Sequence, residues 1–167
     1  PNGHVIRVKE NANEPSATGF TWDIYLFGAE TGAPTGIINL SGLSADQDFS
    51  SPDGLVFTPS TGLCWVQTDD GAYTDVSNCM MMAAVPGTVG DGSSVTLNYG
   101  SNGTVTTRMG KKPTAATLKR FLVGPAGQEI TGLCETPDGK VIFLNVQHPG
   151  EDTAASAIGD PTKYQSH

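Results

Sequence analysis

Residues 54–67 read GLVFTPSTGLCWVQ and residues 132–145 read GLCETPDGKVIFLN, so the chain contains two related segments at an offset of 78 residues. Gly, Leu, Thr and Pro recur in register without a gap, and residues 65–67 (WVQ) align with residues 143–145 (FLN). Each copy predicts a strand, a turn with Pro and Gly, and a second strand. A hairpin repeated in this way is typical of the four-stranded blades of a β-propeller, because one blade cannot bury both of its faces alone. We therefore predict an all-β fold built from propeller blades.

The length of the chain limits how much of a propeller it can form. A complete propeller has about four to eight blades, and 167 residues have room for only about three blades of this repeat length. The 21 Gly, 11 Pro and 16% charged residues fit an all-β protein. We expect residues 1–167 to form a single partial β-propeller domain. No basic, apolar leader precedes the first strand-like stretch, so we expect a processed or partial chain.

The strand-like runs predict one blade around the first copy of the repeat, with units before and after it. The four strands of that blade are expected at residues 55–58, 63–67, 79–85 and 118–123. The preceding unit is expected at residues 3–7 and 20–27, and the third unit begins at Glu129 and includes residues 141–146. A Gly/Ser/Thr-rich insertion over residues 87–117 is expected to hold a hairpin at 94–99 and 103–109. We expect a loop between Gly28 and the blade, and a loose tail over residues 152–167.

The charge and the cysteines restrict the possible partners. The net charge is −8 and the pI is about 4.6, which argues against a nucleic acid or an anionic membrane as partner. Cation binding and a merely solubilising acidic surface both fit this charge. Cys64, Cys79 and Cys134 have no CxxC spacing, so we expect them to be small core residues.

Three short segments contain most of the acidic residues that could bind a cation. They are SPDG, TDDG and GQE, at residues 51–54, 68–71 and 127–129, and they carry Asp53, Asp69, Asp70 and Glu129. Loops at the same end of successive propeller strands converge on one mouth of the channel, so these carboxylates could meet there. Ca²⁺ needs six to eight oxygen ligands of this kind. His148 and Glu151 in QHPGE would add a nitrogen and an oxygen, a mixture that iron or zinc accepts.

Each of these residues also has an ordinary structural interpretation. SPDG and TPDG both form turns readily, so Asp138 is expected to be a turn residue, and Asp53 could be one as well. Asp69 could simply end a strand, and His148 could be a hydrogen-bonded loop residue. Glu129 is harder to explain, because it directly precedes the apolar residue of an inner strand, where a lone carboxylate loses hydration. A bound metal ion would compensate that loss.

Four stretches together carry a resemblance to a known family. They are GHVIRVKE (3–10), FTWDIYLFG (20–28), FSSPDGLVFTPSTGLCWVQTDDG (49–71) and RFLVGPAGQEITGLCETPDGKVIFLNVQHPGE (120–151). In order and spacing they resemble the C-terminal half of the PhoX-type alkaline phosphatases. The resemblance implies a β-propeller phosphomonoesterase that is periplasmic or secreted and holds calcium and iron ions, Ca²⁺ and Fe³⁺, in its channel.

The resemblance also implies roles for particular residues. Glu129 occupies the glutamate of the family's E-(V/I)-T-G motif and is expected to be a metal ligand, with Asp53 of S-P-D-G-L as the next candidate. Asp69 and Glu151 are weaker candidates. Cations held in this way would bind the phosphate oxygens of a phosphate monoester and neutralise the charge that develops during attack.

The resemblance further implies that the chain is incomplete for catalysis. It places the iron-binding cysteine in the N-terminal half, and none of the three cysteines here matches it. No Arg or Lys stands beside Glu129 to bind the phosphate. We therefore expect the isolated chain to be inactive and to need the N-terminal half, or a second copy of itself, to complete the propeller.

Two other functions remain open from the sequence. A calcium-dependent, lactonase-like propeller hydrolase would also place acidic residues around a central cation. A non-enzymatic propeller that binds proteins through its faces would need no metal, and turns would then account for the acids. Assays with phosphate and lactone substrates distinguish the phosphatase from the lactonase-like hydrolase. The metal content of the purified protein distinguishes both enzymes from the protein-binding propeller.

Overall fold

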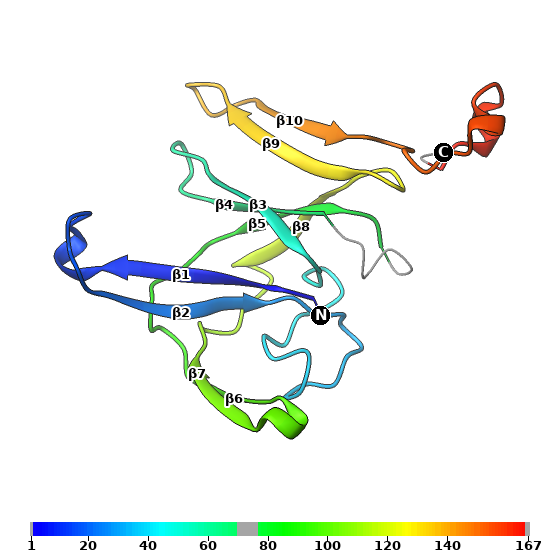
Figure 1. Ribbon diagram of the computed structural model, residues 1–167. Helices are drawn as coiled ribbons and strands as arrows, with labels where there is room; N and C mark the ends of the chain where they lie inside the picture. The colour runs from blue at the N-terminus through cyan, green and yellow to red at the C-terminus, as the bar shows by residue number, and fades with distance from the viewer. Residues whose placement is uncertain (1, 70–76, 166–167) are drawn as a thin grey trace.

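The computed structural model describes residues 2–69 and 77–165 of the chain. Within these residues it contains β-strands in four separate antiparallel sheets and only short 3₁₀ helices (Figure 1), so the all-β prediction is confirmed. The strands are β1 (His4–Glu10), β2 (Phe20–Phe27), β3 (Pro52–Phe57), β4 (Cys64–Thr68), β5 (Met80–Ala84), β6 (Ser94–Asn98), β7 (Thr104–Arg108), β8 (Leu118–Val123), β9 (Glu129–Glu135) and β10 (Ile142–Gln147). The 3₁₀ helices are η1 (Asn11–Asn13), η2 (Gly100–Asn102), η3 (Ala155–Ala157) and η4 (Pro161–Lys163). No helix among the described residues has the length and apolar character needed to span a membrane.

The central element is a four-stranded sheet with the order β3-β4-β5-β8, as the sequence predicts for one blade. Successive side chains of a strand point to opposite faces. In β5, Met80 and Met82 therefore belong to the core on one face, while Met81 belongs to the core on the other. All three are almost fully buried, and burying each contributes roughly 1.5–3 kcal/mol.

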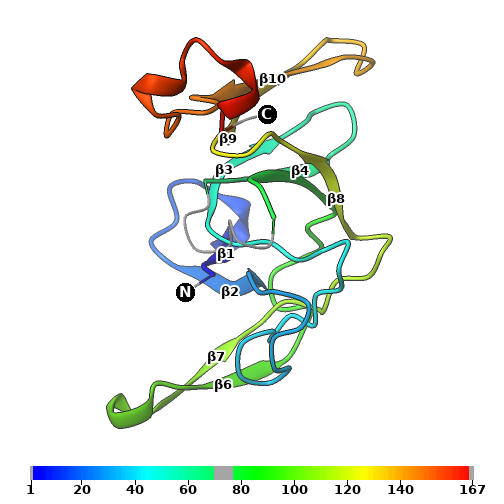
Figure 2. The same ribbon diagram turned by 90° about the vertical axis from the view of Figure 1, so that its right-hand side faces the viewer.

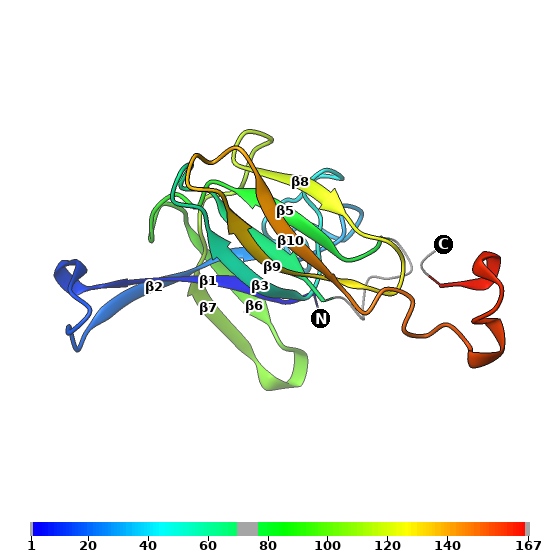
Figure 3. The ribbon, with the colours of Figure 1, turned by 90° about the horizontal axis from the view of Figure 1, so that it is seen from above.

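Each face of this sheet is covered by a two-stranded hairpin (Figures 1 and 3). The β1–β2 hairpin covers one face through Val5, Tyr25 and Leu26. The β9–β10 hairpin covers the other face, where Ile130 packs with Trp65 and Met81. The three layers are compatible with neighbouring blades of a partial propeller, but only the central one has four strands among the described residues.

The long connection between β2 and β3 is well packed. Phe49 is fully buried in the core beside β1–β2, and the Asn39 side chain exchanges hydrogen bonds of 2.7 and 2.9 Å with the backbone of Leu43. Asp48 in this connection forms an ion pair with Arg120 of β8. The connection between β2 and β3 is therefore fixed by buried polar contacts, although its sequence shows only a weak pattern.

The internal sequence repeat is also a structural repeat. In β3–β4, Leu55 pairs with Val66, and in β9–β10, Leu133 pairs with Leu144, which is the same pairing 78 residues later. Both hairpins contain a bulge at the glycine before this leucine. The SPDG segment thus enters a bulged strand, and the turn interpretation of Asp53 is wrong.

The TPDG segment, in contrast, forms the predicted turn. The Asp138 carboxylate accepts hydrogen bonds from the Thr136 hydroxyl at 2.6 Å and from the Lys140 backbone N–H at 3.3 Å. Gly139 follows with φ of 66°, a backbone conformation that favours glycine.

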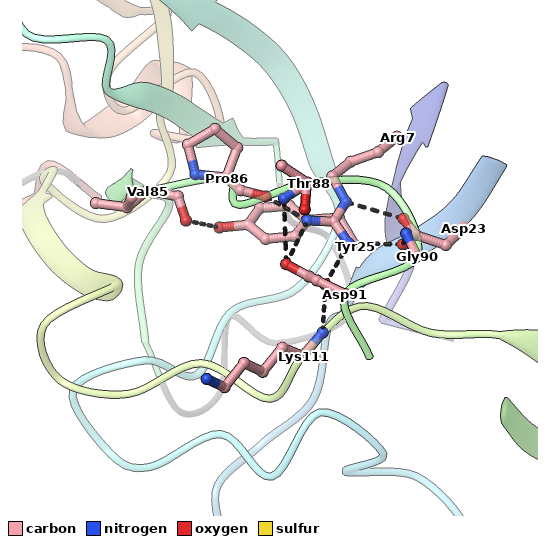
Figure 4. A network of polar contacts seen from close by, with 9 residues as sticks. All are labelled: Arg7, Asp23, Tyr25, Val85, Pro86, Thr88, Gly90, Asp91 and Lys111. Atoms are coloured by element: carbon pink, nitrogen blue, oxygen red, sulfur yellow. Dashed lines mark hydrogen bonds and ion pairs between the residues drawn. The ribbon is translucent and has the colours of Figure 1, made fainter. Parts of the chain in front are cut away.

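The predicted insertion forms the β6–β7 hairpin, which projects away from the three layers (Figure 2). At its base, Arg7 of β1 donates hydrogen bonds to two carboxylates, to Asp23 at 2.6 and 2.9 Å and to Asp91 at 2.8 and 3.3 Å (Figure 4). The Asp91 carboxylate also accepts from the backbone N–H groups of Thr88 and Lys111, so both ends of the insertion are fixed to β1. Arg7 is therefore a structural residue.

The three cysteines do not share one environment. Cys64 and Cys79 are buried, as predicted, and burial raises the pKa of the Cys64 thiol to about 11. Cys134 is exposed, so its predicted core position is wrong. Alternation along β9 places it on the face of the hairpin that points away from the central sheet.

The described part of the C-terminal segment is irregular but has its own contacts. It contains η3 and η4, and Gln165 returns to Asp152, whose backbone N–H donates to the Gln165 side-chain oxygen at 3.2 Å. That the whole chain behaves as one domain with a loose tail stays a prediction.

Candidate metal centre

The hairpin of β3 and β4 brings two carboxylates to the same end of the central sheet. Pro52 at the start of β3 pairs with Thr68 at the end of β4, so Asp53 and Asp69 lie next to this pair. The Asp69 backbone N–H donates to the Ser51 carbonyl at 3.2 Å, which continues the pairing by one residue. Both carboxylate side chains are exposed.

The third carboxylate comes from the neighbouring hairpin. Glu129 is the first residue of β9, and the residue that follows it, Ile130, is buried against Trp65 of β4. This packing holds the start of β9 against the central sheet. Glu129 itself is only 5% exposed, which is unusual for a carboxylate.

The three carboxylates form a compact cluster. One oxygen from each of Asp53, Asp69 and Glu129 lies within 4.8 Å of the other two. They belong to two sheets and are far apart in the sequence, so the arrangement depends on how the hairpins pack. The sequence predicted that these residues meet, and the structure brings these three together.

The electrostatics of the cluster disfavour three negative charges without a cation. Burial, and next the charge of Asp69, raise the pKa of Glu129, while His148 opposes this shift. Asp53 adds a further unfavourable charge. No lysine or arginine in the described part of the chain forms an ion pair with these three carboxylates. Carboxylate oxygens gathered in this way fit a hard cation such as Ca²⁺.

His148 and Glu151 lie beside this cluster. His148 follows β10, and its Nε2 is 3.6 Å from Glu129 Oε1, while its Nδ1 is 3.4 Å from Glu151 Oε2. Glu151 is exposed and does not belong to the three-carboxylate group. Glu151 thus contacts His148, which in turn contacts Glu129. Asp70 falls outside the described residues.

A cleft of about 530 Å³ opens next to the carboxylates. Asp69, His148 and Glu151 line it, together with Gln128. Gln128 is 4% exposed, and its side-chain oxygen has no hydrogen-bond partner among the described residues. The cleft is therefore polar, and it is open to a ligand on the side of the cluster that faces His148.

One buried residue near this centre, Gln67, was not predicted from the sequence. Gln67 is 1% exposed, and its amide lies between the two hairpins that carry the acids. The repeat contains a signal for it, because the amide residue Asn145 stands at the same place 78 residues later.

The fold and the site together define an all-β protein of stacked, blade-like sheets with a cluster of carboxylates at one end. The model of the alkaline phosphatase PhoX family matches residues 1–150 of the chain, and the chain belongs to this family. The resemblance of the motifs is thereby confirmed.

Among solved structures, the chain is similar to Pseudomonas fluorescens PhoX in complex with vanadate, a transition state analogue. The TM-score is 0.67 and the sequence identity is 24%, so this likeness concerns the fold. It covers 98% of this chain and 24% of the Pseudomonas chain, so the present chain spans about a quarter of that protein. A comparison with curated protein sequences found no match.

Proposed function

We propose that Asp53, Asp69 and Glu129 bind a calcium ion, and that the chain contributes this ion to the active centre of a metal-dependent phosphomonoesterase. The observation that carries the proposal is the cluster of three carboxylate oxygens within 4.8 Å of one another. Membership of the alkaline phosphatase PhoX family supports the phosphatase activity. Glu151 is proposed to act from the edge of the site, through His148.

The donor atoms support Ca²⁺ at this position. The three ligands are oxygens, which Ca²⁺ prefers, and the open cleft leaves room for further oxygen ligands from a substrate or from water. Fe³⁺ is proposed for the whole protein, and we propose none of the three cysteines of this chain as its ligand. Cys64 and Cys79 are buried, and Cys134 lies on the far face of β9.

The chain's own residues hold the site in position. A cation bound here would attract phosphate oxygens and neutralise the charge that develops during attack. The β3–β4 pairing orients Asp53 and Asp69, and the buried Ile130 holds Glu129 against them. Because no lysine or arginine among the described residues forms an ion pair with these carboxylates, we propose that groups outside this chain bind the phosphate monoester.

The remaining parts of the site would come from another polypeptide segment. We propose that the N-terminal part of a longer protein, or a second copy of this chain, covers the open hairpin faces and completes the channel. The location would be periplasmic or secreted, as is usual for the family. Sedimentation at high protein concentration distinguishes these two alternatives. If the chain stays strictly monomeric, a second copy is excluded as the partner.

Hydrolysis of p-nitrophenyl phosphate at alkaline pH, with and without added Ca²⁺, tests the proposal. We expect this chain alone to show no turnover, and a protein extended toward the N-terminus to show Ca²⁺-dependent turnover that Glu129→Gln abolishes. A lactone substrate, assayed in parallel, should not be hydrolysed. Hydrolysis of the lactone without the phosphate ester would contradict the phosphatase and favour the lactonase-like hydrolase.

A further inference from the structure

A buried amide connects the two hairpins that carry the proposed calcium ligands. Gln67 lies in β4, is 1% exposed, and is on the same face of the strand as Trp65. Its surroundings on this face are apolar and include Met81, with which it pairs across the strands. Burying an amide costs about 1–3 kcal/mol unless it is hydrogen-bonded, so its presence in this core needs an explanation.

The Gln67 amide bonds to the bulge of the neighbouring hairpin. Its Nε2 donates to the Gly132 carbonyl at 2.9 Å. Gly132 is the extra residue of β9, since the register passes from Thr131 to Leu133 without it, and a bulged residue lacks a partner in its own sheet. The amide therefore provides a partner from the central sheet.

The same side chain occupies the bulge of its own hairpin. A Cβ atom on Gly54 would lie 2.6 Å from Gln67 Oε1, and its three nearest atoms would all belong to Gln67. A side chain at position 54 would therefore displace the amide of Gln67. Gln67 thus touches the residue after Asp53, bonds to the strand that begins at Glu129, and stands two residues before Asp69.

We propose that Gln67 is a positioning residue, which fixes the distance between the carboxylates of β3–β4 and the carboxylate of β9 so that they bind one cation. This inference rests on the proposed calcium site. Packing alone would not require an amide, because methionine has a similar length and would suit the neighbouring Met81 and Trp65. The amide adds a hydrogen bond between β4 and β9, close to the three carboxylates.

Calcium affinity, measured by calorimetric titration of the 167-residue chain, tests the proposal. We expect Gln67→Met to retain the fold by circular dichroism and to bind Ca²⁺ at least about tenfold more weakly, as is typical when a group that orients a metal ligand is lost. The control is Asn98→Met, which changes an exposed amide on strand β6, outside both hairpins that carry the acids, and should leave the affinity unchanged.

A second variant reaches the same amide without changing it. Gly54→Ala displaces the Gln67 side chain and should weaken Ca²⁺ binding to a similar extent. Once Gln67 is shortened to alanine, the clash with its oxygen is gone, so adding Gly54→Ala to Gln67→Ala should cause little further loss. This non-additive result would not be expected of two independent defects in packing.

The possible outcomes separate this inference from the proposed function. If the unchanged chain binds Ca²⁺ and both Gln67→Met and Gly54→Ala bind it equally well, the positioning role is overturned and the calcium site stands. If Gln67→Met fails to fold and Gly54→Ala binds normally, Gln67 is only a core residue. If the unchanged chain binds no Ca²⁺, the proposed site and the positioning role both fall.

Discussion

At the scale of the residue, Glu129 carries the strongest sign of function. A buried carboxylate among other acids lowers the stability of the fold unless a cation joins it, and burial together with Asp69 raises the pKa of Glu129. Selection for stability alone would favour a neutral side chain here. The conflict between stability and charge is typical of a binding site.

Replacing Glu129 by Gln should therefore stabilise the metal-free protein. In the presence of a chelator near pH 8, we expect Glu129→Gln to unfold at a temperature about 2–4 °C higher, which corresponds to roughly 1 kcal/mol for a chain of this length. Calorimetry measures the shift, and the exposed Glu14→Gln serves as the control. A clearly lower unfolding temperature would mean that Glu129 is a structural acid.

Asp91 shows the opposite behaviour, because its charge stabilises the fold. The hydrogen bond from Arg7 holds the pKa of Asp91 well below its ordinary value of 3.8, against the effect of burial. A lowered pKa contributes stability that is fully present above pH 4 or so and is lost as the pH falls toward the folded-state pKa. We expect Asp91→Asn to be less stable than the unchanged protein at neutral pH, and the gap between them to narrow below pH 4. Urea unfolding at several pH values measures this gap, and a gap independent of pH would contradict the role of the carboxylate.

At the scale of the element, the β6–β7 hairpin is separable from the site. The Met109 backbone N–H donates to the Ser93 carbonyl at 2.8 Å, so the two ends of the hairpin already lie side by side. Replacing residues 94–108 by Gly-Ser should change the unfolding temperature by no more than about 2–4 °C and leave Ca²⁺ affinity unchanged. Removing residues 88–111 instead, with Asp91, should destabilise the fold strongly. If the shorter deletion abolishes Ca²⁺ binding, the hairpin is part of the site.

The sequence predicted the elements better than it predicted their environments. The strands of the central blade, the inserted hairpin and the repeated hairpin follow from alternation, turn residues and the 78-residue repeat. The sequence did not reveal that SPDG enters a bulge, because Pro, Asp and Gly favour both a turn and a bulged strand. Nor did it reveal the packing of Phe49 or the exposure of Cys134, since both depend on which faces the hairpins cover.

Only part of the candidate site could be predicted from the sequence, because the rest depends on how the hairpins and loops pack. Asp53, Asp69 and Glu129 were recognised as acids at strand ends, and their convergence follows if the hairpins are neighbouring blades. The position of Glu151 behind His148 depends on the loop after β10, where His148 has φ of 34°. The role of Gln67 could not be predicted, because a single polar residue in a strand carries no information about its partner on another sheet.

At the scale of the whole molecule, the outer faces of the two hairpins are apolar. Phe20 and Trp22 of β2 are 60% and 46% exposed, and Phe143 of β10 is 63% exposed. Exposed apolar faces on sheets are typical of surfaces that contact another sheet. They lie on both ends of the three-layered stack, as is expected of a section of a propeller whose neighbouring blades come from elsewhere.

The number of calcium ions bound per chain, determined by equilibrium dialysis with elemental analysis, shows whether the three carboxylates form a metal centre. We predict one ion per unchanged chain at the Asp53–Asp69–Glu129 cluster, loss of that ion in Glu129→Gln, and retention in Glu14→Gln. Calcium binding that is equal in all three proteins, or absent from the unchanged chain, would contradict the claim that these carboxylates form a metal centre.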